Sequence, residues 1–318
     1  MRVRAARLGL AASLIAPLFY ARAVRKIGKR RRTGWGSHMK VFVFGAVVAA
    51  VVLLSCLPGF ASANPSLLDS GFYSMYNLDF AGAQQRFSVY QHENPDDPMG
   101  PVAEATGLLF SEFDRLGVLQ AQMFVKDASF EARSKLAPDP AVRDKFEVAI
   151  QRSQAMAQRQ FAGNGNDRDA LLASALAAGL KADYLALVQK RNMAALRYAR
   201  QAAGYAQRLL AVCPDCYDAY VATGISKYLI GSRAAPVRWI LRAGGFAGDK
   251  REGIKELQMA AQHGHYLAPF ARILLTIAYL RDQQPQQARA LLADLRAEFP
   301  QNTLFARESE RLGSAAEQ

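Results

Sequence analysis

The chain has 318 residues, of which 51% are hydrophobic, and a formal net charge of +13. This apolar content is enough for one large core or a stack of small ones, which argues against an intrinsically disordered chain. Eleven of the 40 Lys and Arg residues lie in residues 1–63, which contain no Asp or Glu, so the remainder holds 29 basic and 27 acidic residues. A nearly neutral body lacks the charge needed to follow a phosphate backbone, and we expect no nucleic-acid partner.

The beginning of the chain has the pattern of a targeting leader. Residues 1–38 are interpreted as an upstream extension, disordered or helical, or as a mis-called start. Residues 39–63 have the three parts of a signal peptide: Lys40 as the positive flank, an apolar run over 41–57, and small residues ending at Ala63. We therefore expect cleavage after Ala63 and an exported protein in the periplasm or associated with the envelope.

Two alternatives for the leader remain open. The run 41–57 would be an inner-membrane anchor if it were retained, although Pro58 and Gly59 leave it short of the roughly 20 apolar residues that a span needs. Cys56 would be acylated if the leader were a lipoprotein signal. Either alternative gives the protein membrane contact through its N-terminal segment.

Residues 64–312 have the pattern of an all-α domain. Apolar residues recur three and four positions apart, and no long stretch alternates between apolar and polar residues. Turns that contain Pro, Gly or Asn separate these stretches, which predicts antiparallel helical hairpins. Residues 167–211 contain no proline and predict two long helices, and residues 313–318 are expected to form a flexible tail.

Three of the predicted helices share one register. In each, a small residue is followed by an apolar residue four positions later, by another apolar residue seven positions later, and by a proline twelve positions later. The sets are Ala83, Phe87, Tyr90 and Pro95; Ala202, Ala206, Leu209 and Pro214; and Ala288, Leu292, Leu295 and Pro300. The small residue lets two helices approach closely, and the proline ends the helix. Because one hairpin cannot bury its own face, the pattern predicts a stack.

This register resembles the second helix of the tetratricopeptide repeat, and the chain looks like a bacterial member of that superfamily. The last set fits best, because the helix before it has Leu275, Thr276 in place of the usual glycine, and Tyr279. The first set is preceded by Gly71, and a weaker fourth copy has Gly253, Leu257 and Ala260 at the same offsets with His265 in the proline's place. The resemblance implies an irregular α-solenoid of antiparallel hairpins with lengthened middle helices. In this family the first helices line a concave groove where ligands dock.

The sequence contains no recognised catalytic or metal-binding motif. It lacks a Gly-x-Ser-x-Gly elbow, a phosphate-binding Gly-rich loop and a His-Glu-x-x-His helix. His263 and His265 would need at least one more ligand to hold a metal ion, so we interpret them as part of a helix-ending turn. We therefore expect a protein that is not an enzyme and that uses no cofactor or metal.

Cys213 and Cys216 have the spacing of a thioredoxin-like redox pair. In such pairs the first thiol lies at a helix N-terminus, which lowers its pKa. Cys213 is expected at the end of a helix instead, where the helix dipole has the opposite effect. We favour a structural role, either as two packed thiols or as a disulfide across the turn, with a thiol redox protein as the alternative.

Aromatic and basic residues form the candidate partner-binding surface: Tyr217, Tyr220, Tyr228, Arg238, Trp239 and Arg242. The first two tyrosines can share one helical face, and the two arginines lie one helical turn apart. Trp, Tyr and Arg are the residues that most often dominate binding energy. This surface suits an acidic peptide or lipid headgroups; the alternative is that Val237, Ile240 and Leu241 pack inward and the arginines are merely solvated.

These expectations combine into a non-catalytic exported scaffold that binds a partner protein or peptide in the cell envelope. An accessory subunit of an envelope secretion or assembly system is the alternative. The repeat pattern does not identify the partner, because the same hairpins carry many unrelated binding functions.

Overall fold

The computed structural model describes residues 66–119, 136–243 and 247–314. Its contacts divide the chain into two units, Met1–Ala63 and Asn64–Gln318, and all described residues belong to the second. The expectations for the extension 1–38, the signal peptide 39–63, the anchor 41–57, Cys56 and cleavage at Ala63 lie outside the described residues, as do residues 315–318 of the tail.

The described residues form twelve α-helices and one π-helical turn, and they contain no β-strand. The helices are α3 (Leu67–Tyr76), α4 (Phe80–Glu93), α5 (Met99–Arg115), α8 (Pro140–Gly163), α9 (Arg168–Asp183), α10 (Asn192–Val212), α11 (Ala219–Gly231), α12 (Ala235–Ala243), α13 (Lys250–His263), α14 (Ala268–Arg281), α15 (Pro285–Glu298) and α16 (Thr303–Ser314); the π-helical turn is η1 (Tyr184–Val188). The expected all-α class is confirmed.

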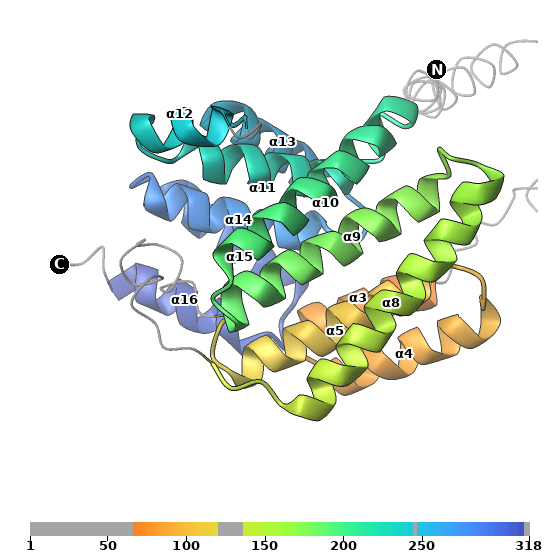
Figure 1. Ribbon diagram of the computed structural model, residues 1–318. Helices are drawn as coiled ribbons and strands as arrows, with labels where there is room; N and C mark the ends of the chain where they lie inside the picture. Colours follow the sequence, from red (N-terminus) through yellow and green to blue (C-terminus); the bar gives the residue numbers. More distant parts are fainter. Residues whose placement is uncertain (1–65, 120–135, 244–246, 315–318) are drawn as a thin grey trace, which may run out of the picture. The chain divides into compact units, whose positions relative to one another are not determined.

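Neighbouring helices pack in pairs: α3 with α4, α5 with α8, α9 with α10, α11 with α13, and α14 with α15. The second helix of each pair also packs on the helix that follows the pair, so that α8 lies against α9 and α15 against α16 (Figure 1). The first helices of adjacent pairs meet as well, as α5 and α9 do. The two longest pairs are α5–α8 and α9–α10. The sequence predicted two long helices for the second of these pairs, over residues 167–211.

Side chains at the helix starts explain why several of these helices begin where they do. The Ser66 hydroxyl accepts a hydrogen bond from the Asp69 amide at 3.1 Å, and the Asp69 carboxylate accepts one from the Ser66 amide, which forms a capping box for α3. Asp139, Asp167 and Asp249 cap α8, α9 and α13 in the same way with their carboxylates. Each cap satisfies backbone amides that have no partner within the helix.

The second helices bury the same positions, counted from their ends. These positions lie eleven and seven residues before the residue that caps the C-terminal end of the helix. They hold buried residues in all five helices: Ala83 and Phe87 in α4, Ser153 and Ala157 in α8, Ala202 and Ala206 in α10, Gly253 and Leu257 in α13, and Ala288 and Leu292 in α15. Four of these helices were found in the sequence; α8 was missed. The shared small residue allows close contact with the first helix of the pair.

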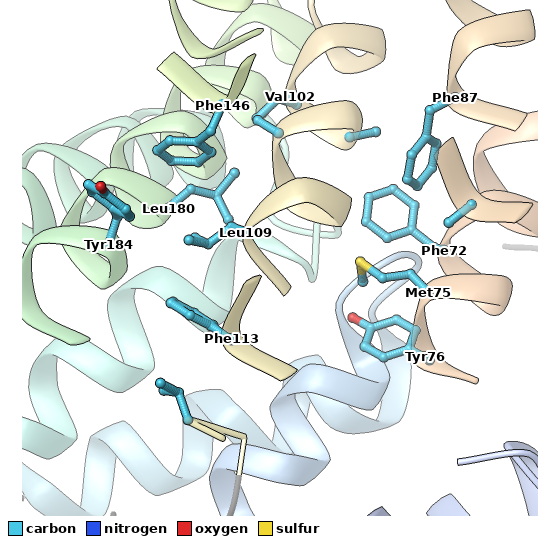
Figure 2. Close-up of a cluster of buried hydrophobic side chains, with 14 of the residues drawn as sticks. Phe72, Met75, Tyr76, Phe87, Val102, Leu109, Phe113, Phe146, Leu180 and Tyr184 are labelled. Atoms are coloured by element: carbon cyan, nitrogen blue, oxygen red, sulfur yellow. The ribbon is translucent and has the colours of Figure 1, made fainter. Parts of the chain in front are cut away.

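The largest cluster of buried side chains contains aromatic residues from several helices (Figure 2). The rings of Phe72 and Phe87 meet edge to face with their centroids 5.4 Å apart, and those of Phe146 and Tyr184 lie 5.5 Å apart. Contacts of this kind join α3 to α4 and α8 to η1. They add specific geometry to the free energy that comes from apolar burial.

The first pair of helices also contacts the last one. The Tyr76 ring lies 5.4 Å from that of Phe299, and the Asn302 amide group donates a hydrogen bond of 2.7 Å to the Tyr76 carbonyl oxygen. The backbone amide of Gln301 donates one of 3.1 Å to the Asn77 side chain. An open stack of hairpins has contacts only between neighbours. Here, residues more than 220 positions apart in the sequence are joined.

One described segment, Arg168–Val188, has the length and the apolar composition of a helix that could cross a membrane. It comprises α9 and η1, and 61% of its most apolar stretch is buried inside the protein. That burial fits a core helix, because α9 packs against α8, α10 and α5.

Candidate functional site

The turn between α10 and α11 is held by a disulfide. Cys213, which caps the end of α10, is bonded to Cys216, and their Cα atoms are 5.4 Å apart. Because Cys213 stands at the C-terminal end of a helix, it lacks the helix N-terminus that acidifies a catalytic thiol. The geometry suits a clamp on the turn, which is one of the two structural roles considered from the sequence.

Asp218, two residues after this disulfide, fixes the turn to the next pair of helices. Its carboxylate is 7% exposed and accepts hydrogen bonds from the backbone amides of His265, Tyr266 and Leu267 at 2.8, 3.0 and 3.1 Å. These amides lie at the start of α14, where they have no partner within the helix. Asp218 therefore holds the α13–α14 turn against the start of α11.

The predicted tyrosines fall into two groups. Tyr217 and Tyr220 lie side by side with ring centroids 6.2 Å apart, and the Tyr217 ring lies 4.9 Å from that of His263. The Asp215 carboxylate beside the Tyr217 hydroxyl raises the pKa of that phenol. Tyr228, however, is only 3% exposed, so its proposed role in partner binding is wrong. It belongs to the contact between α11 and α13, where Gly253 approaches its backbone.

Arg238, Trp239 and Arg242 lie on α12, beyond the other end of α11. Trp239 is 74% exposed and Arg242 is exposed, while the Arg238 guanidinium donates a hydrogen bond of 3.3 Å to the Gly231 carbonyl oxygen. Val237 is 44% exposed, which contradicts the alternative that it packs inward. The 13 residues of α11 span roughly 20 Å at the usual helical rise, so α12 and the Tyr217–Tyr220 pair form separate surfaces.

A polar pocket that the sequence did not indicate lies across α8, α9 and α10. It has a volume of about 300 Å³ and is lined by Gln154, Ala155, Gln158, Ser174, Gln201 and Tyr205. Three helices supply these residues: α8, α9 and α10, of which α8 and α10 both pack against α9 (Figure 1). Glutamines on long helices have the pattern of ordinary solvated surface, and these residues come together only because α8 and α10 both pack against α9.

The chemistry of this lining favours binding over catalysis. Its polar groups are carboxamides and hydroxyls, each of which can both donate and accept hydrogen bonds. The lining has no carboxylate, imidazole, thiol or ammonium group. Such a pocket can pair with the N–H and C=O groups of an extended peptide, whereas it offers no nucleophile with an adjacent base.

Asp183 is a second feature that sequence reasoning missed. It is the last residue of α9 and precedes the π-helical turn η1. Burial raises the pKa of its carboxyl to about 7. Perturbed carboxyls and π-helical turns both occur often at functional sites. The only signal in the sequence was an Asp at the end of an Ala- and Leu-rich stretch.

Within the described ranges, no three His, Cys, Asp or Glu side chains gather where they could hold a metal ion. Comparison with known proteins adds no assignment: no protein-family model matches the chain, and no curated protein matches it. Any functional conclusion therefore rests on the residues and contacts described above.

Proposed function

We propose that this chain is a non-catalytic, tetratricopeptide-like repeat protein of the cell envelope that binds a partner protein or peptide. The observation that carries the proposal is the register shared by α4, α8, α10, α13 and α15, each of which buries a small residue and, four positions later, a second residue against its neighbours. Repeats of such hairpins commonly serve as binding surfaces rather than as enzymes.

The proposed location in the envelope rests on the leader. The boundary between the two units of the chain falls between Ala63 and Asn64, which is the bond expected to be cleaved. A disulfide between Cys213 and Cys216 also suits an oxidising compartment. Mass spectrometry of the protein from its native host should find an N-terminus at Asn64.

We place partner binding in the pocket formed by α8, α9 and α10. Gln154, Gln158 and Gln201 present carboxamides from two helices. Tyr205 adds an aromatic ring, which is stacked with the Phe161 ring at a centroid distance of 6.3 Å. Together these groups can hold an extended peptide by its backbone. Glutamine carboxamides are neutral, so we expect the bound segment to carry little net charge.

Site-specific photo-crosslinking in the native host tests this placement. A photoreactive amino acid replaces Gln158 or Gln201, one from each side of the pocket. The matched control replaces Val148, which lies on the same helix as Gln158 and is 54% exposed. A discrete adduct formed from both pocket positions and not from Val148 supports the proposal. Adducts that are equally frequent at all three positions, or found only at Val148, contradict it.

A further inference from the structure

Helix α12 exposes apolar side chains that the described protein does not cover. Its main packing partner is α11. All of its described side chains, at positions 235–239, 242 and 243, are exposed, including Val237 at 44% and Trp239 at 74%. Leu229, near the end of α11, adds another apolar side chain that is 44% exposed. An exposed group of large apolar residues on one element indicates an interaction surface.

All the charged residues in and around α12 are basic. Residues 228–248 contain Arg233, Arg238 and Arg242 and no Asp or Glu. Arg238 and Arg242 lie one helical turn apart, whereas the helical period places Val237 on a different side of the helix. The result is a short basic amphipathic helix with a tryptophan, and its complement must be both anionic and apolar.

We propose that α12 binds the surface of a membrane that contains anionic phospholipids. An anionic membrane supplies phosphate groups for the arginines and acyl chains for the apolar side within a few ångströms of each other. Tryptophan is favoured at this depth because its ring is apolar and its indole N–H is polar. The inference is independent of the pocket on α8–α10 and would survive the failure of that proposal.

The geometry favours a lipid surface over an acidic protein partner. Arg238 already donates a hydrogen bond to the Gly231 carbonyl oxygen. Arg238 nevertheless remains an exposed residue, and the long apolar stem of an arginine can lie along an apolar surface with its charge at the edge. A protein partner would gain most from a recessed pocket around its anchors. Trp239 instead projects from an exposed helix, as an inserting group does.

Tryptophan fluorescence gives a direct test, because the chain contains only Trp35 and Trp239. The full chain carrying Trp35→Phe leaves Trp239 as the sole emitter, whether or not the leader is retained. This protein is titrated with vesicles of phosphatidylcholine alone or of phosphatidylcholine with phosphatidylglycerol. Brominated acyl chains then report whether Trp239 reaches the hydrocarbon. The leader is identical in every variant, so differences between variants arise outside it.

With phosphatidylglycerol vesicles, we expect the Trp239 emission to shift to shorter wavelength and to be quenched by brominated lipid. Arg238→Gln with Arg242→Gln should weaken this response on the order of tenfold or more, because each basic side chain near an anionic surface contributes to binding. The matched control is Arg197→Gln with Arg200→Gln, which removes the same charge from the exposed side of α10. It should leave the response within about twofold.

Three results would overturn the proposal. The first is an unchanged Trp239 emission when the protein co-floats with phosphatidylglycerol vesicles. The second is an equal shift on phosphatidylcholine alone. The third is a shift produced by a soluble acidic peptide but not by vesicles, which would assign α12 to a protein partner. Circular dichroism of each variant, with unchanged helix content, ensures that a lost response reflects lost binding.

Discussion

At the scale of single residues, Asp218 joins the start of α11 to the turn before α14 through three hydrogen bonds. Replacing it with Ala leaves the amides of His265, Tyr266 and Leu267 without their acceptor. We expect Asp218→Ala to lower the free energy of unfolding by about 3 kcal/mol, because three backbone amides lose a charged acceptor, and that of Leu267 is buried. Urea unfolding measures the loss. Asp215→Ala, in the exposed part of the same turn, should cost less than about 1 kcal/mol; equal losses would refute the role of Asp218.

Asp183 makes stability depend on pH. Its pKa rises from the ordinary 3.8 to about 7 on folding. The folded state therefore holds a proton that the unfolded state releases, and stability falls as pH increases from about 4 to 7. Asp183→Asn removes this loss. We expect the free energy of unfolding of the variant to match that of the wild type at pH 4 and to exceed it at pH 8 by about 2 kcal/mol. This value is smaller than the full pKa shift would give, because the Asp183 side chain is partly accessible to solvent.

Urea unfolding at the two pH values checks this prediction, with Asp294→Asn on the exposed side of α15 as the control. The control should change the free energy of unfolding by less than about 0.5 kcal/mol at both values. A gain from Asp183→Asn that is equal at pH 4 and pH 8 would show that the carboxyl does not titrate as described.

At the scale of helices, the close contact between α11 and α13 depends on a glycine at position 253. A Cβ atom at Gly253 would lie 2.5 Å from the Tyr228 backbone nitrogen and 2.7 Å from the Gly224 carbonyl oxygen, so α11 and α13 would have to separate. Gly253→Ala should destabilise the protein by about 3 kcal/mol. A Cβ atom at Gly204 in α10 meets nothing within 4 Å. Gly204→Ala should instead stabilise it by up to about 1 kcal/mol through helix propensity.

Thermal unfolding of these two variants compares the same substitution in two helices. Opposite shifts of the midpoint are expected. A midpoint raised by Gly253→Ala would mean that α11 and α13 are not in the close contact described.

The repeat register could be predicted from the sequence only for helices with certain ends and certain buried residues. The α4, α10 and α15 helices end just before a proline and bury Ala with large residues, so the register was visible. In α8 the same positions hold Ser153 and Ala157, and the turn after the helix contains Asn-Gly in place of a proline. The register of α8 could therefore not be recognised in the sequence. Ser153 is tolerated there because its hydroxyl donates a hydrogen bond of 2.9 Å to the Pro98 carbonyl oxygen.

The candidate site was less predictable because it depends on neighbours that are distant in sequence. The position of Tyr228 on α11 did not reveal that α13 would cover it. Gln154 and Gln201 lie on different helices, and their shared pocket exists only because α8 and α10 both pack against α9. Trp239 and Arg242 are exposed, as a partner-binding role requires, because α12 packs mainly against α11; that role itself stays a prediction.

At the scale of the whole described unit, the contact between its first and last helices contributes to stability. Asn302 is 5% exposed, and its side chain donates to the Tyr76 carbonyl oxygen and accepts from the Leu304 amide at 2.9 Å. We expect Asn302→Ala to cost about 2 kcal/mol, because it leaves both groups without a partner. Hydrogen exchange should show faster exchange in α3 as well as in α16, although α3 lies far from the substitution in sequence.

The control for this experiment is Asn192→Ala, an exposed residue at the start of α10. It should leave exchange in α3 unchanged. If Asn302→Ala affects α16 alone, then the first and last helix pairs are not energetically coupled.

The same contact sets the order in which the chain can fold during synthesis. Tyr76 and Asn77 meet their partners only after Gln301 and Asn302 have been made, so α3 leaves the ribosome long before its environment is complete. Contacts between such distant residues slow folding, because a long loop must close before they form. A chain whose folding waits for its own last helices stays unfolded longer. If the protein is exported, as proposed above, that delay would leave time for passage through a translocation channel that accepts only extended polypeptide.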